Sequence, residues 1–259
     1  MKPMLVAGNG LSASFMASLV ASLPVSLAQG EGDVVLLQGA GDWPARLMTT
    51  LAQGAKRIIL LDPAPVPELG PVIEQVEAAG ALLLLCETHS DNPAVAPFAA
   101  GLQPVFSTVT VEAQGEDDLA SLLLAQIRVA RGMGMTMGEL LNATAGQDQA
   151  LAMLAARLRG QEVLLRLGAV RCRAGLARLR WMAHGPTDSA CLELDSSGKP
   201  RPVVAWHVNG DGMRNMPSLY ENALRSILRK AVAGAWPADT QALRDWASDA
   251  ALALAIAQG

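Results

Sequence analysis

The sequence predicts an α/β chain whose first domain (residues 1–97) contains a parallel sheet and whose second domain (residues 98–259) is α+β with an open, mostly antiparallel sheet. Up to about residue 90, short apolar runs alternate with helical patterns, which is typical of a parallel sheet. After Glu162, apolar runs follow one another without helices between them, which favours antiparallel pairing. With 259 residues, 51% of them hydrophobic, the chain is long enough to bury two modest cores.

The first apolar run, Met4–Ala7, predicts a buried strand, and the glycines that follow it predict a tight turn into a helix. Gly8, Gly10 and Ala13 have the spacing G-x-G-x-x-A of turns that hold the pyrophosphate of a dinucleotide at a helix N-terminus. Glycine suits such a turn because it permits positive φ and a close approach of the phosphate. We therefore expect these three residues to be the cofactor-binding residues for NAD or NADP, with a tight turn that binds no ligand as the alternative.

The rest of the first domain predicts a shortened sheet. Strands are expected at 33–38, 57–61 and 81–86, with helices between them. A further strand at 24–28 would be joined to Asp33 by only four residues, and adjacent parallel strands need a crossover of roughly a dozen. These two runs therefore cannot both be adjacent parallel strands. The expected fold is a truncated Rossmann-like sheet without much of the half that holds adenosine, and only Glu31 stands near the place of the ribose-binding acid.

The second domain is predicted to combine helices with a run of strands. The helical patterns lie at Leu119–Arg131, Gly138–Arg159, Ser218–Ala233 and Thr240–Ala257. Strands are expected at Val105–Val111, Glu162–Leu167, Leu176–Ala183, Ala190–Asp195 and Val203–Val208, with a hairpin turn at Ser196–Lys199. Four tryptophans fall in this half and are expected in its core or in an interface: Trp181, Trp206, Trp236 and Trp246. An exposed apolar sheet face would need covering, and self-association would cover it.

Composition excludes several classes of function. Twenty Lys and Arg against 24 Asp and Glu show no basic stripe, so we expect no nucleic-acid partner. No apolar run approaches the roughly 20 residues that cross a bilayer, so we expect no membrane association. Cys86, Cys172 and Cys191 have no metal-ligand spacing, which predicts no metal site and a reducing, cytoplasmic location, although a Cys172–Cys191 disulfide remains open. Gly8-Asn9-Gly10 interrupts the N-terminal apolar stretch, so we interpret it as folded domain rather than a signal peptide.

Several segments resemble the Gfo/Idh/MocA oxidoreductase family, which joins a Rossmann domain to an α/β domain with a large open sheet. Leu51–Pro63 looks like the family's helix, strand and Glu-Lys-Pro signature, and Asn92–Val95 like the segment after the next strand. Gly138–Gln149 looks like its Asp-x-x-x-His-x-x-Asp helix, and Asp188–Leu194 like its sheet hairpin. Leu224–Gly234 and Ala247–Ile256 resemble its closing helices. The resemblance implies an NAD(P)-dependent oxidoreductase.

The departures from this pattern fall on the residues that carry the family's chemistry. Leu61-Asp62-Pro63 has no lysine where the family has Glu-Lys-Pro. Asn142, Gly146 and Gln149 stand where the catalytic Asp, the His and the second acid would be, and neither an amide nor a glycine transfers protons near neutral pH.

The leading hypothesis is therefore a member that has lost catalysis, a pseudoenzyme. It would act as a binding or assembly subunit through its open sheet, as a homodimer or other homo-oligomer, or with a related protein. The alternative is an NAD(P)-dependent oxidoreductase acting on a sugar- or cyclitol-like molecule, with His89 or Asp62 as the catalytic proton-transfer group. His89 follows the strand at 81–86, where ligands of α/β proteins bind. A third option is a small-ligand sensor.

Overall fold

The computed structural model describes residues 4–23, 26–30, 33–103, 105–173, 177–195, 203–217 and 221–259. They form two compact units: residues 1–88 with 223–248, and residues 89–222 with 249–259. The division after Thr88 lies nine residues before the expected boundary at 97/98, and a C-terminal segment belongs with the first unit. The expected hairpin turn at Ser196–Lys199 and the acid Glu31 lie outside the described residues.

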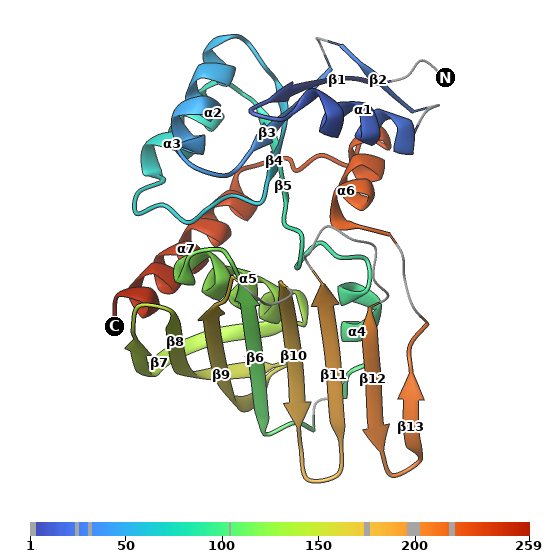
Figure 1. Ribbon diagram of the computed structural model, residues 1–259, viewed down its shortest axis with the longest axis vertical. Coiled ribbons are helices and arrows are strands. Elements are labelled where there is room, and N and C mark those ends of the chain that lie inside the picture. Colours follow the sequence, from blue (N-terminus) through green and yellow to red (C-terminus); the bar gives the residue numbers. More distant parts are fainter. Residues whose placement is uncertain are drawn as a thin grey trace. The chain divides into compact units, whose positions relative to one another are not determined.

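The first unit is a five-stranded, wholly parallel sheet with helices on both faces, as the sequence predicts (Figure 1). The strands are ordered β2-β1-β3-β4-β5. They are β1 (Met4–Asn9), β2 (Leu27–Gln29), β3 (Val34–Gln38), β4 (Arg57–Leu61) and β5 (Leu82–Cys86). The helices are α1 (Ala13–Ser22), α2 (Trp43–Ala52), α3 (Gly70–Ala78), α6 (Ala223–Val232) and the first part of α7 (Gln241–Gln258).

The short link between β2 and β3 is possible because these strands pair with opposite sides of β1. Met4–Val6 pair with β2, whereas Val6–Asn9 pair with β3, so the two neighbours overlap only at Val6. The backbone N–H of Leu5 donates to the Asp33 carboxylate at 2.7 Å. The two runs are therefore not adjacent to each other, as the sequence argument requires, and no described helix connects them.

Each face of the parallel sheet has its own helices. On one face, Met16 of α1 and Ile227 of α6 are buried in a cluster against which Trp236 packs. On the other face, the rings of Trp43 in α2 and Trp246 in α7 pack edge to face, with centroids 5.8 Å apart. Trp236 and Trp246 therefore stabilise the first unit, and the expectation that they belong to the antiparallel half is wrong. The spacing of apolar residues in the sequence could not show that residues 223–248 pack on the parallel sheet of the first unit.

The second unit is an eight-stranded sheet with the order β13-β12-β11-β10-β6-β9-β8-β7. Every neighbouring pair is antiparallel except β6 and β9, so the sheet is mixed and mostly antiparallel. Its helices are α4 (Val95–Gly101), α5 (Leu119–Gly132) and the end of α7 from Asp249. The strands are β6 (Thr108–Gly115), β7 (Met135–Ala145), β8 (Gln149–Leu158), β9 (Gln161–Arg171), β10 (Arg178–His184), β11 (Ser189–Asp195), β12 (Val204–Asn209) and β13 (Gly212–Asn215).

The helix expected at Gly138–Arg159 is wrong, because this segment forms β7 and β8 instead. Its Leu, Ala, Met and Arg residues favour a helix by intrinsic propensity. Burial nevertheless alternates along β8: Ala150, Ala152, Leu154, Ala156 and Leu158 are all buried. Pairing with β7 and β9 and burial of this face override the propensity.

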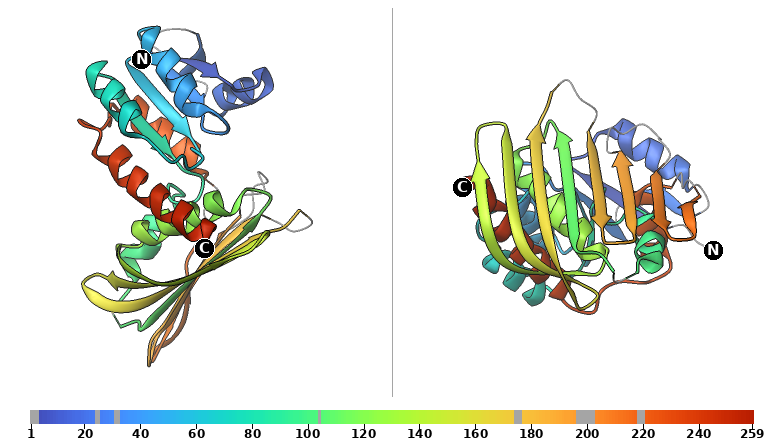
Figure 2. Two further views of the ribbon diagram at one scale, coloured as in Figure 1. Left: turned by 90° about the vertical axis from the view of Figure 1, so that its left-hand side faces the viewer. Right: turned by 90° about the horizontal axis from the view of Figure 1, so that it is seen from below.

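One face of the second sheet is covered and the other is open. Gln126 of α5 is buried and its side-chain amide bonds both the N–H and the carbonyl of Gly168 at 3.0 Å, which fixes the helix on the sheet. The Asp249 carboxylate, buried at 1% exposure, accepts from Arg128 at 3.1 Å and from Arg131 at 2.6 Å. No described helix of this unit covers the opposite face, which the right-hand view of Figure 2 shows in front.

Two further findings concern the chain as a whole. Its three cysteines are free thiols, so the disulfide that the sequence left open is not formed. Within the described ranges, no helix is both long and apolar enough to span a bilayer.

Candidate functional site

The carboxyl ends of the parallel strands meet at one edge of the first sheet, where α/β proteins bind ligands. Gly8 lies near the end of β1, and its missing side chain leaves room for α1. A Cβ atom at Gly8 would lie 2.8 Å from the sulfur of Met16 and 3.0 Å from its Cγ. A residue larger than glycine would therefore make the buried Met16 side chain shift, whether or not a phosphate binds.

The second half of the turn combines a glycine in the left-handed region with a capped helix N-terminus. Gly10 has φ of +77°, which glycine adopts without strain. Ser12 caps α1 by accepting from the N–H of Phe15 at 3.2 Å, and Ala13 is the first helical residue. The sequence prediction of a strand, a glycine turn and a helix is thus confirmed as local structure, while cofactor binding by these residues stays a prediction.

Two side chains lie against this turn that sequence reasoning missed. A Cβ at Gly10 would be 3.4 Å from the Cβ of Gln38 and 3.7 Å from the Nε of Arg46. The Nη2 of Arg46 donates to the carbonyl oxygen of Gln38 at 2.8 Å and also to that of Ala40. The guanidinium connects the start of α2 to the carboxyl end of β3 and places a positive charge beside Gly10. The only sequence signal for this contact is that Arg46 follows closely after a second glycine-rich turn, Gly39–Gly41.

A hollow of about 630 Å³ lies along β1 and β3 on the side of α2. Asn9, Asp33, Thr50 and Arg57 contribute to its lining, and the Asn9 amide donates to the Thr50 hydroxyl at 2.9 Å. The hollow begins at Gly8 and Asn9 but extends towards the amino ends of the strands.

Asp62, one of the two proton-transfer candidates, is engaged in a structural contact. It follows β4 with φ of +41°, and its two carboxylate oxygens accept from the N–H and the hydroxyl of Thr88, each at 2.6 Å. Its own N–H donates to the carbonyl of Cys86 at 2.9 Å. The carboxylate therefore ties the loop after β4 to the loop after β5.

The other candidate, His89, is the first residue of the second unit and is half-buried. It begins a turn in which the N–H of Asn92 donates to its carbonyl at 3.2 Å. Asp62 and His89 belong to different units, and a catalytic role for either residue stays a prediction.

The other two histidines have contacts of their own. His207 packs edge to face on Phe98 of α4, with centroids 4.7 Å apart, and burial followed by the charge of Arg214 lowers its pKa. His184 ends β10, and its Nδ1 lies 3.1 Å from the hydroxyl of Ser189.

The residues matched to the family's catalytic helix lie on two strands and in the turn between them, so that correspondence is wrong. Asn142 is on the edge strand β7, Gly146 is in the turn after it, and Gln149 opens β8. The helix that follows β6 is α5, and its sequence LASLLLAQIRVARG contains neither histidine nor an acidic residue. Among the described residues, no three His, Cys, Asp or Glu side chains cluster as a metal site would require.

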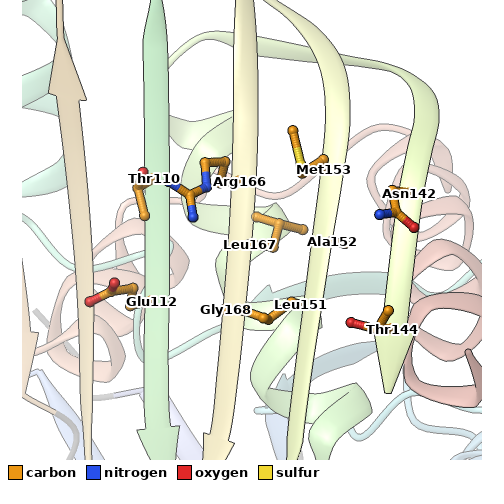
Figure 3. Close-up of a pocket in the computed structure, with 10 residues that line it drawn as sticks. All are labelled: Thr110, Glu112, Asn142, Thr144, Leu151, Ala152, Met153, Arg166, Leu167 and Gly168. Carbon is orange, nitrogen blue, oxygen red and sulfur yellow. The ribbon is translucent and has the colours of Figure 1, made fainter.

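The open face of the second sheet is the other candidate site. Apolar side chains on it are strongly exposed: Leu151 at 58%, Val170 at 49%, Val204 at 49% and Met213 at 60%. A shallow hollow of about 200 Å³ lies over β6, β9, β8 and β7, with Gly168 leaving space between Glu112 and Leu151 (Figure 3).

The comparisons with known proteins identify the fold. No family model and no curated protein sequence matches the chain. Among solved structures, it is similar to the UDP-N-acetylglucosamine 3-dehydrogenase GnnA from Acidithiobacillus ferrooxidans, with 15% identity, a TM-score of 0.66, and coverage of 100% of this chain and 98% of that one. It is also similar to KijD10, a 3-ketoreductase from Actinomadura kijaniata in complex with TDP-benzene and NADP, with 12% identity, a TM-score of 0.65, and coverage of 99% and 96%.

These solved structures are oxidoreductases of the Gfo/Idh/MocA type, which is the family that the sequence resembles. At such low identity the likeness establishes the fold alone. The chain therefore has the oxidoreductase fold that combines a Rossmann-like parallel sheet with a second, mostly antiparallel sheet.

Proposed function

We propose that the chain is an oxidoreductase homologue that has lost catalysis and acts as a binding or assembly subunit through the open face of its second sheet. The observation that carries this proposal is the set of exposed apolar side chains on that face, Leu151, Val170, Val204 and Met213. These side chains lie towards the two edges of the sheet, on β12 and β13 and on β8 and β9, and exposed apolar side chains that gather on one face mark interaction surfaces. Burying them against a partner would supply a hydrophobic driving force.

The loss of catalysis is supported by the structural roles of the residues that could carry catalysis or bind a cofactor. Asp62 is held by Thr88, and α5 carries no proton-transfer group. Gly8 leaves room for the buried Met16 side chain, which gives this glycine a packing role. The adenosine half of the parallel sheet is reduced to the three-residue strand β2. Each of these features favours a retained scaffold over a working active site.

The alternative is an NAD(P)-dependent oxidoreductase acting on a sugar- or cyclitol-like molecule. It is favoured by the intact turn geometry at Gly10 and Ser12 and by the positive charge of Arg46 beside it. The solved structures point the same way, since GnnA is a sugar-nucleotide dehydrogenase and KijD10 was crystallised with NADP. In this case His89 would transfer the proton, and His89→Ala would abolish turnover while leaving the fold intact.

Sedimentation velocity over a range of concentrations tests the proposal. We expect self-association or association with a related chain, weakened by Leu151→Glu and by Val204→Glu on the open face. Phe15→Glu is the matched control, because Phe15 is also an exposed apolar residue, at 38%, but lies on α1. The proposal fails if the open-face variants associate like the wild type.

Titration with NADH and NADPH separates the two functions. The assembly proposal predicts no saturable binding and no turnover of sugar nucleotides, sugars or cyclitols. Saturable binding with turnover, lost in His89→Ala, would establish the alternative instead.

A further inference from the structure

The hollow along β1 and β3 has an apolar floor. Ala7 of β1 lies beside Val35 of β3 in the parallel register, and both side chains are partly exposed in the lining. Their neighbours Val6 and Val34 are instead buried with Met16 on the other face of the sheet. Because side chains alternate along a strand, Ala7 and Val35 face away from α1. They form a surface on which the hydrocarbon part of a ligand can lie.

Hydrogen-bond acceptors stand at both ends of this floor. Asn9 ends β1, and its Nδ2 donates to the hydroxyl of Thr50 at 2.9 Å, while that hydroxyl donates to the carbonyl of Arg46 at 2.8 Å. This chain of bonds orients the Asn9 amide and leaves its Oδ1 as an acceptor. At the other end, Oδ2 of Asp33 accepts from the N–H of Leu5 at 2.7 Å, and Oδ1 remains as a second acceptor. Both ends can therefore receive hydroxyl groups.

Arg57 places a positive charge at the amino end of the hollow. It opens β4, the strand beside β3, so it stands near Asp33, and its side chain is exposed. In the part of the chain that the structure describes, no ion pair within 4 Å involves Arg57. Lys56 adds a second positive charge to the lining, although its ammonium also donates to the carbonyl of Ala79 at 2.6 Å. The planar fork of a guanidinium suits the two-point binding of a phosphate.

We propose that this hollow binds a small phosphate monoester whose organic part carries hydroxyl groups. The phosphate lies at Arg57, and the hydroxyls donate to Asp33 and Asn9. The hydrocarbon part lies on Ala7 and Val35. A volume of about 630 Å³ is within the range of small-molecule sites, roughly 300–1,000 Å³, and it leaves room for an organic part beyond the phosphate itself. The carboxylate of Asp33 repels a bare phosphate ion but accepts from a hydroxyl, so the site favours the ester.

The site differs from the glycine turn in where its charge comes from. Arg57 belongs to β4 and lies towards the amino ends of the strands, whereas Gly10 and Arg46 lie at the carboxyl ends, before α1 and in α2. The inference therefore does not depend on the proposed function, and it holds whether or not the chain assembles or binds a dinucleotide.

Isothermal titration calorimetry of the full chain tests the site, with glucose 6-phosphate, inorganic phosphate and glucose as probes. We expect glucose 6-phosphate to bind saturably and more tightly than inorganic phosphate, and glucose to bind more weakly than its phosphate ester. Arg57→Ala should raise the dissociation constant for glucose 6-phosphate at least about 10-fold, since it removes charge-assisted hydrogen bonds. Arg166→Ala removes an exposed arginine of β9 in the second unit and should change nothing.

Two further variants test the rest of the site. Asp33→Asn should weaken binding of glucose 6-phosphate, because a neutral amide oxygen is a weaker acceptor, and should tighten binding of inorganic phosphate, because the repulsion is removed. Val35→Phe fills the floor of the hollow with a ring and should weaken binding of the ester while Arg57 is still present. Circular dichroism checks that each variant is folded.

Three results would overturn the inference. The first is that glucose 6-phosphate shows no saturable binding to the wild type. The second is that Arg57→Ala and Val35→Phe, both folded, bind it as tightly as the wild type does. The third is that Arg46→Ala abolishes binding while Arg57→Ala leaves it unchanged, which would place the phosphate at the glycine turn instead.

Discussion

Replacing Gly8 by alanine tests whether this glycine serves packing or phosphate binding. The added Cβ would lie 2.8 Å from the sulfur and 3.0 Å from the Cγ of Met16, which is itself buried. Overpacking of this kind costs about 1–3 kcal/mol. With a denaturant dependence of about 2 kcal/mol per molar urea, the unfolding midpoint should fall by roughly 0.5–1.5 M.

The second step is a double-mutant cycle with Met16→Ala. Truncating this buried side chain costs about 2–5 kcal/mol by itself, but it also removes the atoms that the new Cβ would meet. Gly8→Ala should therefore cost close to nothing in the Met16→Ala background, and the coupling between the two sites should equal about 1–3 kcal/mol. Gly70→Ala is the control, because a Cβ at Gly70 has open space.

Urea denaturation followed by tryptophan fluorescence measures the cycle. Trp43 and Trp246 report on the same unit, since they pack on its sheet. The reasoning is refuted if Gly8→Ala is as stable as the wild type and instead abolishes binding of NADH or NADPH. The role of Gly8 would then be to let a phosphate approach the turn and not to make room for Met16.

Three further predictions follow from contacts elsewhere. In urea denaturation, Asp249→Asn should lower the free energy of unfolding by about 3 kcal/mol, because it removes one partner of a buried ion pair. Glu162→Gln is the control: its ion pair with Arg157 is exposed, at 85% and 64%, and its loss should cost under about 0.5 kcal/mol. Burial lowers the pKa of His207, so the unfolded chain binds a proton at pH values where the folded chain does not. The contribution of His207 to stability should therefore be full above about pH 6.5 and should decline as the pH falls towards the lowered pKa. Thermal melts between pH 5 and 8 should show a smaller decline for His207→Gln than for the wild type. Asp62→Asn and Thr88→Val should each lower the melting temperature with non-additive effects; a stable Asp62→Asn variant that loses a measured activity would show a catalytic role instead.

The sequence predicts the parallel sheet well because its signals are local. Apolar runs such as Arg57–Leu61 are bounded by turn residues, and the helices between them have regular apolar spacing. The argument that 24–28 and 33–38 cannot be neighbours rests on chain length alone, and the register of β1 confirms it. Side chains also alternate along β12, so His207 lies on the face opposite to Trp206 and packs on Phe98.

What the sequence could not predict depends on distant contacts. The segment Gln149–Leu158 has helix-forming residues, and its pairing with β7 and β9, with alternate side chains buried, makes it a strand. The return of α6 and α7 to the first sheet rests on contacts such as Trp43 with Trp246, separated by two hundred residues of chain. The filling of the Gly8 position by Met16 could not be read from the motif, because the same glycine spacing serves packing and phosphate alike.

The most direct test of the account is oxidative footprinting of the open face at increasing protein concentration. Met153, Met182 and Met213 lie on that face, and Met48 on α2 is an internal reference. Assembly through this face predicts that oxidation of the three methionines falls as concentration rises, while that of Met48 stays constant. Oxidation of all four that is independent of concentration would contradict the account.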